Sequence, residues 1–190
     1  MSTKQFFSQF NQLSVPSIEK LENIFKVQKY SKGDNIAGNN QNESNFFFLN
    51  KGISCSFLTD KKGKNYIRTL FTPPEPIVSL PTFVNQQIVN IKYHCLTDCF
   101  FLKTNYNAFL DAVKERQDIS LFYIEIMEVS YGKLLDRVTD LTTLNATERY
   151  LKIKKKIPDI ENLIPQYHIA SYLNITPVQL SRIRKKLYSR

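Results

Sequence analysis

No apolar stretch in the 190-residue chain approaches the roughly 20 consecutive residues that a membrane-spanning helix needs. The first residues mix Phe6, Phe7 and Phe10 with polar side chains at helical spacing, so the continuous apolar run of a signal peptide is also missing. We therefore expect a cytoplasmic protein with no membrane partner.

Cysteine is scarce. Cys55, Cys95 and Cys99 are the only three, and they form no C-x-x-C pair. An odd count without that motif favours free thiols in a reducing compartment. His94 lies near Cys95 and Cys99, but neighbours in a strand point to opposite faces, and two thiols with one imidazole fall short of a closed zinc site. We therefore expect buried core cysteines, no metal and no other cofactor.

Residue types that carry catalysis are few. His94 and His168 are the only histidines, and the sequence contains no nucleophile–base pairing and no glycine-rich phosphate loop. His168 falls in a helical segment where a phosphate contact or plain exposure is expected. The sequence argues against an enzyme.

Positive charge is plentiful and uneven. The chain carries 26 Lys and Arg against 17 Asp and Glu, a net charge of +9. Residues 146–190 hold 10 basic side chains against 3 acidic ones. A basic patch attracts the phosphate backbone of nucleic acids through counterion release, and its binding is strongly salt-dependent.

The basic region ends in a helix-turn-helix pattern that begins at Gln166. Apolar or small residues fall where such a unit needs them: Ile169, Ala170, Leu173, Ile175, Leu180 and Ile183. Asn174 stands at the turn, where a left-handed backbone is usually required and asparagine is tolerated. Thr176, Pro177 and Gln179 combine a cap hydroxyl, a proline at the first helical position and a capping-box partner.

The second helix of this unit has one face suited to DNA. Pointing Leu180, Ile183 and Leu187 inward turns a polar and basic set outward. The DNA-binding candidates are Thr176, Val178, Gln179, Ser181, Arg182, Lys185 and Lys186. Arginine can present a bidentate fork to guanine, and valine can pack on a thymine methyl. Gln179 ranks below Arg182, because a side chain in the capping box cannot also read a base. The alternative is a solvated cationic face.

The remaining chain alternates between helical and strand patterns. Residues 4–26 predict one or two short helices, and residues 106–115 and 146–156 predict one helix each. Short runs bounded by turn signals predict seven or eight strands in an antiparallel roll or barrel. These runs are 26–30, 46–49, 53–58, 66–71, 77–80, 91–96 and 99–103.

A long uninterrupted helix is predicted from about Asp118 to Leu144. Its apolar stripe is wider than one small roll can cover, which favours pairing with a second copy as a coiled coil. The dimerisation candidates are Ile119, Phe122, Tyr123, Ile126, Val129, Leu134, Val138 and Leu141. The alternative is a helix that packs only on its own domain.

This order of elements resembles the Crp/Fnr family of bacterial transcription regulators. The resemblance covers nearly the whole chain and rests on the residues at 32–36, 48–52, 146–150, 169–177 and 180–187. It implies an α+β fold with a cyclic-nucleotide-binding-like antiparallel β-roll over residues 1–117, a dimerisation helix over 118–144 and a DNA-binding winged helix-turn-helix over 145–190. The wing is expected to be missing or minimal, since only three residues follow Leu187.

Two family signatures are absent. Members that bind cyclic nucleotides carry a Gly-Glu pair and an Arg-Ser or Arg-Thr pair, but the corresponding stretches here are 78–83 and 87–90, and no arginine occurs between Arg68 and Arg116. Lys92 could offer a cyclic phosphate only a point charge and not the bidentate contact of an arginine. Cyclic AMP is therefore not expected as the effector. The three cysteines do not supply the N-terminal group of the oxygen-sensing members either.

The leading hypothesis is a homodimeric, sequence-specific transcriptional regulator that does not bind cyclic AMP. The resemblance implies an inverted repeat in double-stranded DNA, a second copy of the chain and RNA polymerase as partners, with an effector of unknown identity. The alternative is a ligand-sensing or protein-interaction module that acts without reading a DNA sequence.

Overall fold

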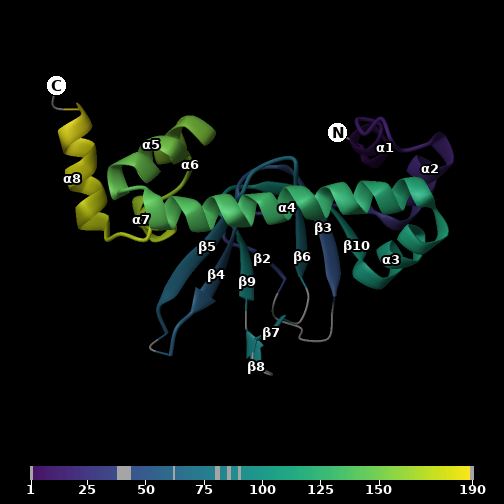
Figure 1. The fold of residues 1–190 in the computed structure, drawn as a ribbon, viewed down its shortest axis with the longest axis horizontal. Helices are drawn as coiled ribbons and strands as arrows, with labels where there is room; N and C mark the ends of the chain where they lie inside the picture. The colour runs from purple at the N-terminus through teal and green to yellow at the C-terminus, as the bar shows by residue number, and fades with distance from the viewer. Residues whose placement is uncertain are drawn as a thin grey trace.

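The structure is a computed structural model that describes residues 2–37, 44–61, 63–79, 82–84, 87–89 and 91–188, with backbone only for residues 37, 79, 82–84 and 87–89. The long helix α4 (Gln117–Thr143) runs across the molecule, with a β-roll on one side of it (Figure 1). Short helices from the N-terminal part of the chain gather at one end of α4, and the C-terminal helices gather at the other.

The roll consists of antiparallel strands in two four-stranded sheets. One sheet has the order β1 (Lys26–Tyr30), β10 (Cys99–Asn105), β3 (Asn45–Lys51) and β6 (Glu75–Ser79). The other has the order β2 (Asn35–Ala37), β9 (Ile91–Cys95), β4 (Ser54–Thr59) and β5 (Asn65–Phe71), and β7 (Thr82–Val84) pairs with β8 (Gln87–Val89). The predicted roll is confirmed. The three strands β2, β7 and β8 were not predicted, because each has only three residues and therefore no readable alternation.

A close backbone approach fixes the turn between β3 and β4. Gly52 has φ +97°, and a Cβ atom there would lie 2.4 Å from the carbonyl oxygen of Asp98. Only glycine fits both the conformation and the space. This contact joins the start of β4 to the turn that precedes β10.

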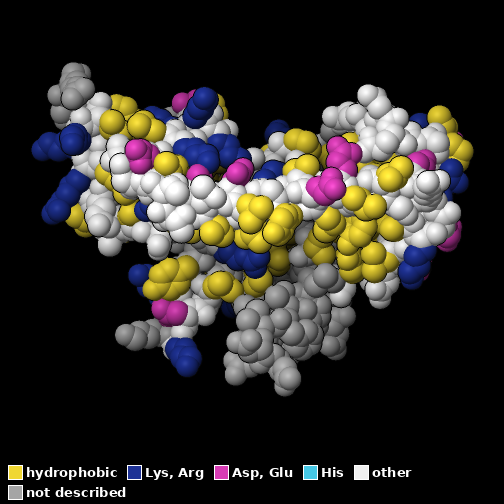
Figure 2. All heavy atoms as spheres, viewed as in Figure 1, with side chains coloured by type: hydrophobic (Ala, Val, Ile, Leu, Met, Phe, Trp, Pro, Cys, Tyr) yellow, Lys and Arg dark blue, Asp and Glu magenta, His cyan; other side chains and the backbone are white. Residues whose placement is uncertain are grey.

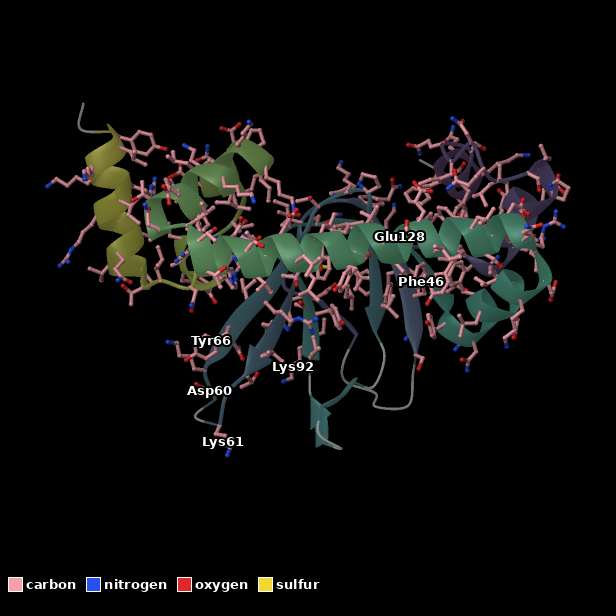
Figure 3. All side chains as sticks on the ribbon, in the orientation of Figure 1. Phe46, Asp60, Lys61, Tyr66, Lys92 and Glu128 are labelled. Atoms are coloured by element: carbon pink, nitrogen blue, oxygen red, sulfur yellow. The ribbon has the colours of Figure 1, made fainter. Side chains whose placement is uncertain are left out.

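A cluster of phenylalanines joins the roll to the helices α1 (Thr3–Phe7), α2 (Val15–Ile24) and α3 (Tyr106–Glu115) and to the first half of α4. Phe46 of β3, labelled in Figure 3, lies in this cluster. Its ring stacks on that of Phe109 of α3, with 4.5 Å between ring centroids. Phe122 of α4 lies in the same cluster and is almost fully buried. This burial anchors the first half of α4 to its own roll.

The three cysteines are free and buried, as the sequence predicted. Burial raises the pKa of the Cys55 thiol to about 12. Cys95 and Cys99 pack in the core between the two sheets. Among the described residues, no helix has both the length and the apolar character needed to cross a membrane.

Four helices follow α4: α5 (Ala146–Lys156), α6 (Ile160–Leu163), α7 (Gln166–Tyr172) and α8 (Pro177–Tyr188). Their apolar side chains share one core cluster with roll residues, including Phe57 and Ile67. The four-residue α6 was not predicted, since it is too short for helical periodicity to be read. The division of the chain into three domains stays a prediction, because this core is continuous between the roll and the last helices.

Candidate nucleic-acid interface

The helices α7 and α8 form a helix-turn-helix whose turn depends on Asn174. Its φ of +55° is left-handed, as predicted from its position. The N–H of Asn174 donates to the carbonyl of Ser171 at 3.1 Å, and the N–H of Ile175 donates to the carbonyl of Ala170 at 3.0 Å. These bonds close the end of α7 and redirect the chain into α8.

The start of α8 is a capping box. The N–H of Gln179 donates to Oγ1 of Thr176 at 3.2 Å, and the N–H of Thr176 donates to Oε1 of Gln179 at 2.8 Å. The predicted cap is therefore present. Because the side chain of Gln179 is engaged in it, Gln179 is less available for a base than Arg182 is.

The outward face of α8 carries most of the predicted DNA-binding residues. Val178 is 61% exposed, and Ser181, Arg182, Lys185 and Lys186 are exposed as well. Leu180 is fully buried on the opposite side of the helix, with Ile183 and Leu187 packed against the same core. Figure 2 shows Lys and Arg side chains at the end of the molecule formed by α8. A protruding helix with this face matches what a major groove admits.

Arg184 differs from the other basic residues of α8, because it is turned toward α6. Its Nε lies 2.8 Å from Oε1 of Glu161. Burial acts to raise the pKa of Glu161, but a hydrogen bond from Tyr150 and the charges of Arg184 and Lys154 bring that pKa below its ordinary value. The ionised Glu161 therefore fixes the outer half of α8 to its neighbours, and Arg184 has a structural role.

Two contacts hold the helix-turn-helix against the rest of the chain. The N–H of Ile67 in β5 donates to Oγ of Ser171 in α7 at 2.9 Å. The guanidinium of Arg137 in α4 donates to the carbonyl of Tyr172 and lies over its ring, with 4.1 Å between Cζ and the centroid. Burial lowers the pKa of Arg137. The unit is therefore tied both to the roll and to the long helix.

A cavity of about 730 Å³ lies between the roll and the helix-turn-helix. Both histidines line it. Burial lowers the pKa of His94, and so does the charge of Lys92. Burial also lowers the pKa of His168, with the charges of His94 and Lys32 acting in the same direction. Both imidazoles are therefore held toward the neutral form. His168 is half-buried and does not lie on the exposed face of α8.

The predicted dimerisation residues fall into two groups along α4. Ile119, Phe122 and Ile126 are buried in the phenylalanine cluster, and Tyr123 packs against it. Their side chains are thus used within one chain and leave little surface for a second copy. Val129, Leu134, Val138 and Leu141 are exposed.

Four further exposed apolar residues of α4 were missed in the sequence: Leu121, Ile124, Tyr131 and Leu135. With Glu128, Val138 and Thr142 they recur at alternating steps of three and four residues. That spacing is the a and d pattern of a coiled coil. We call these seven residues the α4 seam. Figure 2 shows apolar side chains gathered along α4. The spacing of these residues could have been recognised in the sequence. It was missed because the stripe that faces the core contains larger side chains and dominates the apolar pattern of the helix.

No protein-family model matches the chain, and no curated protein matches it either. Solved structures do. FixK2 from Bradyrhizobium japonicum is 14% identical over 87% of this chain and 85% of that protein, with a TM-score of 0.71. The c-di-GMP responsive regulator CLP from Xanthomonas campestris is 12% identical over 93% and 92%, with a TM-score of 0.69. A Crp/Fnr-family regulator from Eubacterium rectale is 13% identical over 96% and 87%, with a TM-score of 0.73.

The chain combines a β-roll, a long helix and a C-terminal helix-turn-helix. The chain has the fold of the Crp/Fnr regulators, and its structural neighbours include members of that family. The α+β fold class and the resemblance seen in the sequence are therefore confirmed by the fold. At these low identities the likeness concerns the fold, and function has to be argued from this chain's own residues.

Proposed function

We propose that this protein is a homodimeric, sequence-specific DNA-binding transcriptional regulator. The observation that carries the proposal is the exposed outer face of α8, with Val178, Arg182 and Lys185 projecting from a helix whose start is fixed by a capping box. Arg182 is placed to read guanine, and Lys185 and Lys186 to contact phosphate or base. RNA polymerase as a further partner follows only from the resemblance.

The α4 seam supports the dimer. Its exposed apolar residues lie on the side of the helix away from the phenylalanine cluster, so a second copy can pack there without disturbing the core. Two recognition helices held in this way would enter successive major grooves. The preferred site would be an inverted repeat with half-sites about 34 Å, or ~10 base pairs, apart.

We further propose that cyclic AMP is not the effector. The stretches that lack the cyclic-nucleotide signatures, 78–83 and 87–90, lie largely outside the residues whose side chains are described. The cavity of about 450 Å³ between the roll and α4 contains Glu75, whose side chain is buried. Glu75 is paired with Lys133 at 3.2 Å, and Arg68 lines the same cavity, so the proposal rests on the missing signatures. Lys92 is half-buried on β9 (Figure 3).

The test is selection of bound sequences from a random DNA pool by the purified protein, without added effector and at near-physiological salt. We expect an inverted repeat to be enriched. With that site in hand, Arg182→Lys keeps the charge but loses the bidentate fork. It should relax the preference at one base pair per half-site, at a cost of about 1–3 kcal/mol in discrimination. Arg182→Ala should lose the preference together with affinity.

Lys114→Ala is the matched control, because it removes one exposed positive charge from α3, at the opposite end of the molecule from α8 (Figure 1). It should leave the selected sequence and its affinity unchanged. If the pool stays unenriched and Arg182→Ala binds as well as the wild type, the protein does not read DNA through α8, and an interaction module becomes the better assignment.

A further inference from the structure

A second basic region lies away from the outer face of α8. A cavity of about 540 Å³ opens between α4, α5 and the end of α7. Six of its lining residues are basic: Lys133, Arg137, Arg149, Lys152, Lys155 and Lys156. Two lining residues, Asp136 and Asp140, are acidic. Figure 2 shows Lys and Arg side chains gathered where α5 faces α4. The cavity therefore carries a clear excess of positive charge.

The existing contacts neutralise only part of this charge. Nζ of Lys152 lies 2.6 Å from Oδ1 of Asp140, and Nζ of Lys133 lies 3.2 Å from Oε1 of Glu75. Lys155 and Lys156 are exposed, and within the described part of the chain neither has a hydrogen-bond or ion-pair partner. These two lysines are therefore free to contact a ligand.

The two arginines of the cavity are bound to backbone carbonyls, which leave a guanidinium's charge unneutralised. Arg137 donates to the carbonyl of Tyr172. Nε of Arg149 donates to the carbonyl of Leu173 at 3.2 Å, and its Nη1 donates to the carbonyl of Leu144 at 2.5 Å. Each guanidinium has five N–H donors, so donors remain on both.

We propose that this cavity binds a small anion that carries one or more phosphate groups. Ammonium and guanidinium groups are the usual partners of phosphate oxygens, and arginine adds a bidentate geometry. The apolar walls formed by Ile153 and Leu173 strengthen the attraction by keeping water away. The volume lies within the ~300–1,000 Å³ of pockets that hold small ligands.

The cavity stays open in the proposed dimer. At ~100° per residue, the lining positions Lys133, Arg137 and Asp140 lie on the side of α4 opposite to the α4 seam. A second copy packed on the seam would therefore leave the entrance free.

An anion bound in the cavity would affect the position of the helix-turn-helix. Arg137 and Arg149 donate to the carbonyls of Tyr172 and Leu173 at the end of α7, and an anion in the cavity would bind the remaining donors of the same guanidiniums. A ligand that binds better to one position of α7 relative to α4 shifts the population toward that position. This regulatory step rests on the proposed function, whereas binding of the anion does not.

The experiment uses pyrophosphate as the probe and the full chain without DNA, in calorimetric titrations at low ionic strength. We compare the wild type with Lys155→Gln/Lys156→Gln. The control is Lys26→Gln/Lys114→Gln, which removes two exposed charges from β1 and α3. We expect one pyrophosphate per chain, about tenfold weaker binding in the cavity variant and unchanged binding in the control. Circular dichroism shows that each variant is folded.

Two outcomes overturn the proposal. Equal weakening in both double variants would show that pyrophosphate responds to net charge alone. Unchanged pyrophosphate affinity in the cavity variant would show that the anion does not bind at Lys155 and Lys156. Since the titration contains no DNA, failure of α8 to read a sequence leaves its result intact.

Discussion

The hydroxyl of Ser171, in the first helix of the helix-turn-helix, accepts a hydrogen bond of 2.9 Å from the backbone N–H of Ile67. Ile67 belongs to β5, an edge strand of its sheet. An edge strand leaves a row of backbone groups unpaired. At Ile67 this edge is therefore covered by the helix-turn-helix, and the N–H of Ile67 finds its acceptor there.

Ser171→Ala should lower the free energy of unfolding by about 1–2 kcal/mol, because the part-buried N–H of Ile67 loses its acceptor. Urea denaturation measures the change. Ser181→Ala is the matched control, since Ser181 is also helical but exposed on α8, and any gain in helix propensity is the same at both positions. Equal stability of the two variants would argue against the contact.

Asn174→Ala and Asn174→Gly should have different effects on the stability of the fold. An alanine at φ +55° adopts a left-handed conformation at a cost of roughly 1–2 kcal/mol, whereas glycine adopts it without strain. We expect the alanine variant to be clearly less stable than the wild type and the glycine variant to be equal to it or more stable. Thermal unfolding followed by circular dichroism checks this. An alanine variant as stable as the glycine variant would contradict the strain argument.

Leu135→Glu should convert the proposed dimer to a monomer. Leu135 is 49% exposed in the single chain, so its replacement leaves the core intact, but it would place two carboxylates against each other across the α4 seam. Sedimentation velocity gives the mass. Leu163→Glu makes the same change at a similarly exposed position on α6 and should stay dimeric.

Glu128 offers the converse change within the same seam (Figure 3). In the proposed dimer, Glu128→Leu would remove a like-charge pair at a position where coiled coils prefer apolar residues, so the variant should dissociate at a lower protein concentration than the wild type does. If Leu135→Glu remains dimeric and Glu128→Leu leaves the dissociation of the dimer unchanged, the interface does not lie at the α4 seam.

Acid should destabilise the protein through its two histidines. The pKa values of His94 and His168 are lowered in the folded chain, so the unfolded chain binds protons more readily. Stability from these groups is complete above the ordinary histidine pKa of about 6.5 and is lost as the pH falls through the folded values.

Urea unfolding between about pH 7.5 and about pH 5 measures this loss of stability. The window lies above the ordinary pKa of glutamate and aspartate, so carboxylates contribute little. His94→Gln/His168→Gln should show a flatter dependence of the unfolding free energy on pH. An unchanged slope in this variant would assign the acid sensitivity to other groups.

Local signals in the sequence were sufficient to predict the elements whose ends are set by nearby residues. The cap at Thr176 and Gln179 predicted the beginning of α8, and Asn174 predicted the left-handed turn before it, because both depend on interactions within a few residues. The outward position of Arg182 followed from helical periodicity alone. The strands longer than three residues were found by the same kind of local reasoning.

Other features depended on contacts between distant parts of the chain. The sequence determined that α4 has more apolar surface than one face can use, but only the tertiary structure decided that Phe122 belongs to the phenylalanine cluster and that Leu135 is left exposed. The basic run at 152–156 is visible in the sequence, but only folding brings it together with Lys133 and Arg137 of α4 and the end of α7. Periodicity fixes which residues share a face, whereas packing decides what each face meets.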